Sequence, residues 1–211
     1  AWGERANTLA QSIGATGSVA IAQCHRGRAA MSLDQHASAI RLHEQLLADL
    51  RPDASPNIRA GVLNRLGVSH LEQGDAQAAA PWLAQALDAY QALDEPLAAD
   101  QTAATAALCE ARLGRNDAAL TRVNALLDRL DGDLAARPAH ETIEMRWTCQ
   151  QVLAMVGDGR AVPLLDQLFA DVQARATELT EPADRERLIQ ALPVFRAVVA
   201  AGQPRGAAAT P

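Results

Sequence analysis

Cys24, His25, His36 and His43 are the first residues along the chain whose types could carry out chemistry. A thiol with imidazoles nearby can serve a nucleophilic or a metal site. His36 and His43 stand seven residues apart, which places them on one face of a helix. A catalytic pair also needs a group that orients the imidazole, and none can be placed in the sequence. Cys24 lies in an apolar helical stretch, where a free thiol packs as a small hydrophobe, so we assign these residues to packing.

His140 and Glu144 form a second candidate, because they lie one helical turn apart in the stretch HETIE. The spacing is similar to the HExxH helix of zinc proteases, but Glu144 stands where the second His would be, and no third ligand is evident. We interpret these residues as charged groups at a helix start. A helical metalloenzyme is kept as the third hypothesis, and we predict no metal and no catalytic residue.

Two glycine pairs, Gly14/Gly17 and Gly157/Gly159, are not phosphate loops. Neither is followed by Lys and Ser or Thr, and neither follows a predicted strand. Both pairs are predicted to be turns, and the sequence indicates no cofactor.

The composition predicts a helical chain without a nucleic-acid or membrane partner. Of its 211 residues, 49% are hydrophobic, dominated by Ala and Leu, and 3% are aromatic, which favours helices over strands. The net charge is -6, every basic residue is Arg, and no basic stripe is present. No apolar run reaches the roughly 18 residues of a membrane span. Three widely spaced cysteines indicate no disulfide framework, so we expect a reducing cytoplasm.

The stretch Leu63–Asp75, LNRLGVSHLEQGD, has the pattern of a helical hairpin. Gly67 lies inside the apolar helical pattern, where it allows another helix to approach closely, and Gly74-Asp75 reads as a helix stop followed by an N-cap. The same pattern recurs along the chain. Its small residue returns at Gly27, Gly67 and Ala107, and its stop returns at Asp34, Gly74, Gly114 and Gly157.

The second helix of each hairpin also repeats. Five residues after each stop a small residue is expected to pack against the first helix, and a second position follows four residues later. The first position is held by Ala39, Ala79, Ala119 and Val162, and the second by His43, Leu83, Val123 and Asp166. The predicted units are 18–56, 57–94, 95–137 and 138–180. Residues 1–17 are expected to contain the second helix of a truncated preceding repeat, 181–202 a capping helix, and 203–211 a disordered tail.

The second unit resembles the tetratricopeptide repeat. Leu66-Gly67, Gly74-Asp75, Ala79, Leu83 and Ala86 follow that family's order, and the resemblance covers residues 18–180. It implies an all-α fold, a right-handed α-α superhelix of about four helical hairpins with a C-terminal capping helix. The period here is 40 to 43 residues rather than the family's usual ~34, and no closing Pro is in its usual place. Longer units of this kind resemble the C-terminal arrays of large bacterial signalling ATPases and transcription regulators.

The resemblance implies a concave groove, lined by the first helix of each hairpin, that binds a protein or peptide segment. Matching positions place these residues on the groove: Arg28, Asn64, Val68, Glu72, Leu108, Arg112, Trp147, Gln151 and Met155, with Cys24, Ser32 and Ala104 beside them. The alternative is that a short array buries Trp147, Leu108 and Met155 between helices. The groove that clamps a C-terminal carboxylate in this family uses Lys, which this chain lacks.

Three functional hypotheses follow from these patterns. The first is a non-enzymatic interaction module, the C-terminal sensor or scaffold of a bacterial regulator, whose partners are another protein or the upstream domains of its own polypeptide. Because the chain starts in the middle of a helical pattern without Met, we expect it to be part of a longer polypeptide. The second is a receptor domain for a peptide or small ligand, and the third is the metalloenzyme based on His140 and Glu144.

Overall fold

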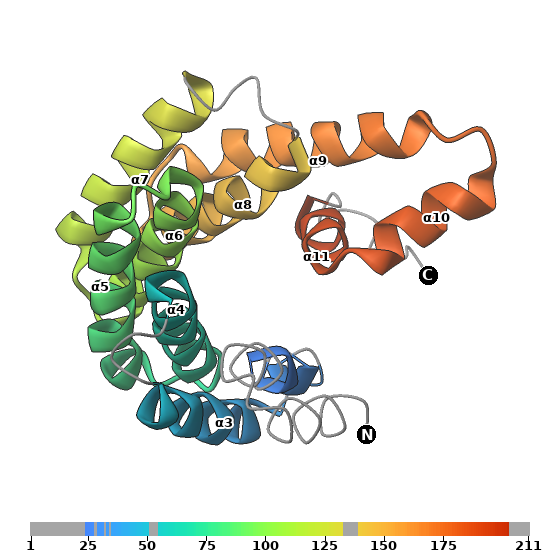
Figure 1. Cartoon of the computed structure of the whole chain (residues 1–211). Helices are drawn as coiled ribbons and strands as arrows, with labels where there is room; N and C mark the ends of the chain where they lie inside the picture. Colours follow the sequence, from blue (N-terminus) through green and yellow to red (C-terminus); the bar gives the residue numbers. More distant parts are fainter. Residues whose placement is uncertain are drawn as a thin grey trace, which may run out of the picture. The chain divides into compact units, whose positions relative to one another are not determined.

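The computed structural model describes residues 24–27, 29–31, 33, 35–50, 55–132 and 139–202, without the side chains of 139–141. All regular elements in these ranges are helices (Figure 1). After a helical segment at 24–31, with residue 28 outside the description, they are α3 His36–Asp49, α4 Pro56–Glu72, α5 Ala76–Ala92, α6 Pro96–Arg112, α7 Asn116–Asp131, α8 Ala139–Val156, α9 Ala161–Thr177, α10 Pro182–Ala191 and α11 Pro193–Gly202. The helix expected within 1–17 and the disordered tail expected at 203–211 lie outside the described residues.

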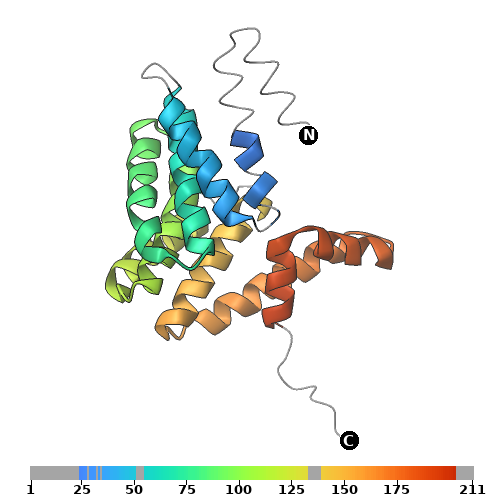
Figure 2. The same ribbon diagram turned by 90° about the horizontal axis from the view of Figure 1, so that it is seen from below.

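The chain divides into two compact units, 1–119 and 120–211, and the boundary falls within α7. In the first unit α3, α4, α5 and α6 pack in succession, each against the next, as both ribbon views show (Figures 1 and 2). The first helices of neighbouring hairpins, α4 and α6, also contact each other. In the second unit α8 packs on α9, and α11 packs on both of them.

The hairpin of α4 and α5 has the geometry that its glycines predict. Gly74 has φ +85°, a left-handed conformation in which glycine is not strained. Asp75 caps α5, because its Oδ1 accepts a hydrogen bond from the Ala78 amide at 2.9 Å. A Cβ on Gly67 would lie 2.5 Å from Leu83 Cγ, so the close helix approach assigned to Gly67 is confirmed.

The small-residue position of the second helix holds in three of the predicted units but not in the fourth. Ala39, Ala79 and Ala119 are fully buried, whereas Val162 is 66% exposed and its expected packing role is wrong. The reason is a turn two residues longer. The helix α5 begins two residues after Gly74, but α9 begins four residues after Gly157. The two packing positions of α9 therefore lie two residues later than predicted. They are held by the buried Leu164 and Leu168, and Asp166 is exposed.

The predicted single helix at 181–202 is two helices, α10 and α11, separated at Leu192. Proline has no amide hydrogen and disfavours helical backbone in the residue before it, and Leu192 before Pro193 is extended with ψ 115°. The second piece, α11, carries the buried Phe195 and Val198, and α10 carries no buried residue. The helix α11 therefore covers α8 and α9 at this end of the chain.

Candidate interaction surface

The face of α4 predicted to line a groove is partly open. Asn64 and Val68 are half-buried and Glu72 is exposed. The Oδ1 atom of Asn64 is shielded from water, and no group in the described part of the chain donates a hydrogen bond to it. A shielded polar atom without a partner is unfavourable. Since the residue as a whole is half-buried, rotation of the amide toward the open face of α4 would let it pair with a peptide group there.

The matching residues of α6 take part in packing and hydrogen bonding within the fold. Leu108 is 8% exposed and Ala104 is 3% exposed, so both belong to the core, as in the alternative in which the array covers Leu108. Arg112 has an exposed side chain, but its Nη1 donates a short hydrogen bond to the carbonyl oxygen of Leu71 near the end of α4. This contact ties α6 to the neighbouring first helix α4, within the first unit.

The predicted groove residues of the second unit lie on α8. Trp147 and Gln151 are half-buried, and Met155 is 50% exposed. Met155 is therefore available at a surface, and its expected burial between helices does not occur. Two further positions, Arg28 and Ser32, lie outside the described residues.

Cys24, His25, His36 and His43 differ in how deeply they are buried. Cys24 packs against the core cluster of Ile40, Leu46, Val62 and Leu66, which confirms the packing role assigned to its thiol. His25 is exposed and His36 is half-buried, whereas His43 is fully buried. The four residues do not form a metal site, since the described residues contain no group of three or more His, Cys, Asp or Glu side chains placed to hold an ion.

His43 occupies the position that Leu83 has in the next repeat. Its ring faces Gly27, where a Cβ would lie 2.1 Å from Nε2. Neither ring nitrogen forms a hydrogen bond of good geometry in the described structure, and the contact with the Cys24 backbone is a weak one. Burial and the nearby charge of Arg65 lower the pKa of His43 from 6.5 to about 4, while the backbone of Cys24 has a smaller opposite effect. The imidazole is therefore neutral at physiological pH.

Arg65 and Tyr90 are functional candidates that the groove pattern did not include. The Nε atom of Arg65 is shielded and has no partner among the described residues, although the residue as a whole is half-buried. The Tyr90 hydroxyl lies 3.6 Å from the Cβ position of Gly61, which is one helical turn before Arg65 on the same face of α4. Burial raises the pKa of Tyr90, and the nearby charge of Arg65 opposes that shift. A comparison of repeat positions could have found both residues, because the sequence one repeat further on has neutral side chains there.

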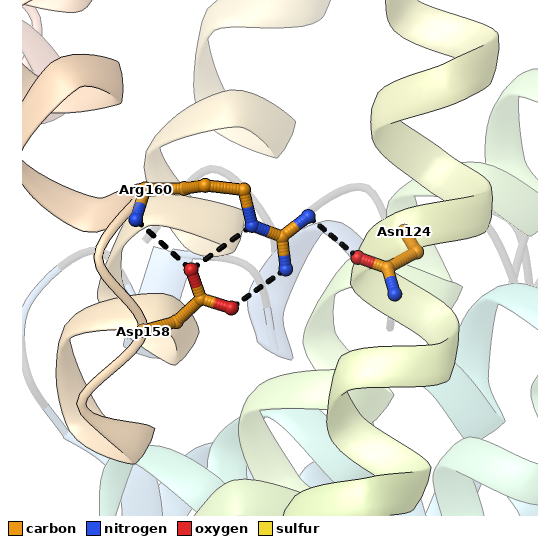
Figure 3. A network of polar contacts seen from close by, with 3 residues as sticks. All are labelled: Asn124, Asp158 and Arg160. Atoms are coloured by element: carbon orange, nitrogen blue, oxygen red, sulfur yellow. Dashed lines mark hydrogen bonds and ion pairs between the residues drawn. The ribbon is translucent and has the colours of Figure 1, made fainter.

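In the second unit a polar network ties the α8–α9 turn to α7 (Figure 3). The guanidinium of Arg160 donates to both carboxylate oxygens of Asp158, at 2.9 and 2.7 Å, and its Nη1 donates to Asn124 Oδ1 at 2.8 Å. The side-chain and backbone hydrogen bonds from Arg160 lower the pKa of Asp158 to about 2. Asp158 therefore keeps its charge at neutral pH, and this network positions the turn rather than a ligand.

The two remaining thiols, Cys109 and Cys149, are held in their neutral form, and the His140 candidate lies partly outside the described residues. Cys109 donates from Sγ to the Ala76 carbonyl oxygen at 3.2 Å, and burial raises the pKa of Cys149 to about 12, so neither thiol is ionised at neutral pH. Glu144 is exposed, and the side chain of His140 lies outside the described residues. The metal hypothesis at this pair stays untested. None of the helices described is both long and apolar enough to pass through a membrane.

Comparison with solved structures identifies the class of fold. No protein-family profile and no curated protein matches the sequence. A crystal structure of the nearly identical TPR-like repeats assigned to a Podosopora anserina kinesin light chain matches with a TM-score of 0.56 and 18% identity, over 86% of this chain and 95% of that one. The crystal structure of a single-residue variant of those repeats matches with a TM-score of 0.56 and 17% identity, over 86% and 94% of the two chains.

At these identities the similarity shows the fold alone. The chain has the all-α, TPR-like solenoid fold that its repeats predict. It is therefore a helical-repeat scaffold.

Proposed function

We propose that this protein is an interaction module that binds a protein or peptide segment along the exposed face of α4 in the first unit. The observation that carries the proposal is the shielded Oδ1 of Asn64, which no described group satisfies. An asparagine amide has both acceptor and donor atoms, so it can pair with a peptide group of a bound segment. Val68 and Glu72 lie one and two helical turns further along the same face and are open to contact.

The two repeats at this surface support a partner that is an extended segment rather than a deeply buried small molecule. The neighbouring first helix α6 contacts α4, and its Leu108 closes the core beneath, while Arg112 is engaged by the Leu71 carbonyl. The contact surface is therefore carried mainly by α4. In the second unit Trp147, Gln151 and Met155 form a separate candidate surface on α8, with Met155 the most accessible of the three.

The binding test is selection of peptides from a random displayed library on the full chain, followed by affinity measurements with single variants. We expect Asn64→Ala and Val68→Asp to weaken a selected peptide at least tenfold, since interface anchors cost more than ~1 kcal/mol when removed. Gln85→Ala on the exposed face of α5 is the matched control and should have no effect. If selected peptides bound all three variants equally, the proposed surface on α4 would be wrong.

We further propose that the module is the C-terminal regulatory part of a larger cytoplasmic bacterial signalling or transcription-regulatory protein, and that upstream domains of the same polypeptide are among its partners. The 40-residue period supports this context through its resemblance to such arrays, and the three free thiols fit a reducing compartment. The test is the gene sequence upstream of Ala1. An encoded ATPase, kinase, cyclase or DNA-binding domain is expected there, and an immediate start codon would refute this part of the proposal.

A further inference from the structure

Polar side chains gather where the first and second repeats meet, inside the first unit. The charge of Arg65 on α4 acts on both His43 of α3 and Tyr90 of α5, and Cys24 of the preceding helical segment also acts on Tyr90. The Tyr90 hydroxyl lies 3.6 Å from the Cβ position of Gly61, one helical turn before Arg65, so Tyr90 packs on the face of α4 that carries Arg65. Three helices and the segment before them thus bring a guanidinium, a phenol, an imidazole and a thiol together.

The fold itself does not require these polar groups. The repeat provides an internal control, because each element of the next hairpin begins 40 residues later. At the matching places stand neutral residues, with Leu83 for His43, Thr105 for Arg65 and Leu130 for Tyr90. Leu83 and Leu130 are buried in the ordinary way, and Thr105 donates to the Gln101 carbonyl oxygen of its own helix. The polar set is therefore a local addition to a scaffold that packs without it.

The cluster holds a shielded hydrogen-bond donor that the described residues leave unpaired. The Nε atom of Arg65 is shielded from water and has no hydrogen-bond partner among the described residues. Glu95 acts on Tyr90 from an exposed position. A shielded N–H group without an acceptor is unfavourable, so an acceptor brought by a ligand would stabilise this part of the fold.

We propose that Arg65 and Tyr90, with the buried ring of His43 beside them, form a binding site for a carboxylate. A guanidinium binds a carboxylate through two parallel hydrogen bonds, and the tyrosine hydroxyl can donate a third. Since Arg65 is half-buried, part of its side chain reaches the surface, where the acid would approach. The carboxylate belongs either to a free organic acid or to the segment bound along α4, and in the second case the inference rests on the proposed function.

The experiment compares the full wild-type chain with Arg65→Thr and Tyr90→Leu, which copy the residues of the next repeat and so preserve a packing that the fold accepts. Arg41→Thr on the exposed face of α3 is the control for loss of a positive charge. In the first arm, sodium acetate is titrated against sodium chloride at equal ionic strength. We expect acetate to raise the thermal midpoint of the wild type and of Arg41→Thr more than chloride does, and Arg65→Thr to lose this difference.

A second readout comes from the NMR titration of His43. A carboxylate held beside Arg65 screens the guanidinium charge. An acetate derivative that stays ionised near pH 4, trifluoroacetate, should therefore raise the pKa of His43 above its value of about 4 in the wild type but not in Arg65→Thr. A role of Arg65 in packing alone would not produce this trifluoroacetate dependence.

In the second arm, each acidic residue of a selected peptide is replaced by its amide. We expect one replacement to weaken wild-type binding at least tenfold and to have no effect on Arg65→Thr. A response to acetate alone identifies a free acid as the ligand, and a response to peptides alone identifies the bound segment.

If neither arm depends on Arg65 while peptides still require Asn64, the carboxylate site is refuted and the proposed function stands. If acetate acts through Arg65 but no peptide binds, the carboxylate site stands and the proposed function fails.

Discussion

At the residue scale, His43 shows how one polar side chain changes the physical behaviour of a repeat. It fills the place of a leucine against Gly27, but it forms no hydrogen bond of good geometry with the described residues, and the charge of Arg65 acts on it. Protonating it would place a second cation in the core. The folded chain therefore accepts this histidine only in its neutral form.

This gives a defined dependence of stability on pH. The unfolded chain binds a proton at His43 near pH 6.5 and the folded chain only near pH 4, so the unfolded state is favoured progressively between these values. The contribution is fully present above pH 6.5, and the free energy of unfolding should fall by up to ~3 kcal/mol as the pH falls to about 4. Urea unfolding at pH 7.5 and pH 4.5 measures this change.

The control is His43→Leu, which restores the residue of the next repeat. Its free energy of unfolding should lose most of the difference between the two pH values. An unchanged difference would show that other groups cause the acid sensitivity and that His43 is not held neutral by the fold.

Arginine side chains perform a second residue-scale role, which is to bind the carbonyl groups that remain unpaired at helix C-termini. Arg146 donates from Nη2 to the Leu130 carbonyl oxygen at 2.9 Å and to Asp131 Oδ1 at 2.7 Å, both at the end of α7. The same role is filled at the ends of α4 and α10 by Arg112 and Arg196. Arg185 donates to the Leu179 carbonyl oxygen in the turn that follows α9. In a chain without Lys, the branched guanidinium can serve two acceptors at once.

Replacing Arg146 by Met should keep its apolar stem and remove both hydrogen bonds. Because the side chain is only 15% exposed, we expect a loss of ~1 to 3 kcal/mol in the free energy of unfolding. Urea denaturation followed by circular dichroism measures the loss, with Arg41→Met as an exposed control. A loss no larger than that of the control would contradict a capping role for Arg146.

At the scale of the elements, the hairpin of α4 and α5 is defined by close contact between the two helices. Gly67 has the side chain and the backbone nitrogen of Leu83 against it, the latter 3.2 Å from where a Cβ would be. A side chain at Gly67 would therefore have to push the whole of α5 away. Gly61, on the same helix, has only the Tyr90 hydroxyl at 3.6 Å, which is an ordinary contact distance.

These two glycines make a matched pair of predictions. Gly67→Leu should destabilise the protein by ~1 to 3 kcal/mol through overpacking, whereas Gly61→Ala should be neutral or stabilise by up to ~1 kcal/mol through helix propensity. Urea unfolding of both variants tests this, and equal effects of the two substitutions would show that α4 and α5 are not in the close contact described.

At the scale of the whole molecule, each compact unit carries one well-buried thiol. Cys109 lies in the first unit and Cys149 in the second, and both are about 1% exposed. Burial raises the pKa of each thiol, that of Cys149 to about 12. Neither thiol can react until its own unit opens, so the two cysteines report separately on the stability of the two units.

We expect Gly67→Leu to expose Cys109 to a thiol reagent at a lower urea concentration than in the wild type and to leave the labelling of Cys149 nearly unchanged. Repeat proteins gain stability from neighbouring elements, so damage in the first unit should remain largely local. Pulsed labelling with mass spectrometry of tryptic peptides measures both sites. An equal shift at Cys149 would mean that the chain unfolds as one cooperative body.

The sequence by itself determined the helical class, the repeat of about 40 residues and the hairpin turns, because these depend on local chemistry. Gly74, Gly114 and Gly157 all adopt positive φ, and Gly67 allows the predicted close approach, since only glycine meets these backbone and steric demands without strain. Such requirements depend on one or two residues, so they can be predicted without knowledge of the rest of the fold.

Only the tertiary structure decided which side chains are available and which are enclosed. The longer turn after Gly157 moved the register of α9 and exposed Val162, and the position of α6 buried Leu108. The nearness of Arg65 to His43 and Tyr90 also appeared only in three dimensions, because it joins three helices that are separated along the chain. Exposure and charge pairing depend on what neighbouring elements bring to a position, and a repeat pattern fixes the position but not those neighbours.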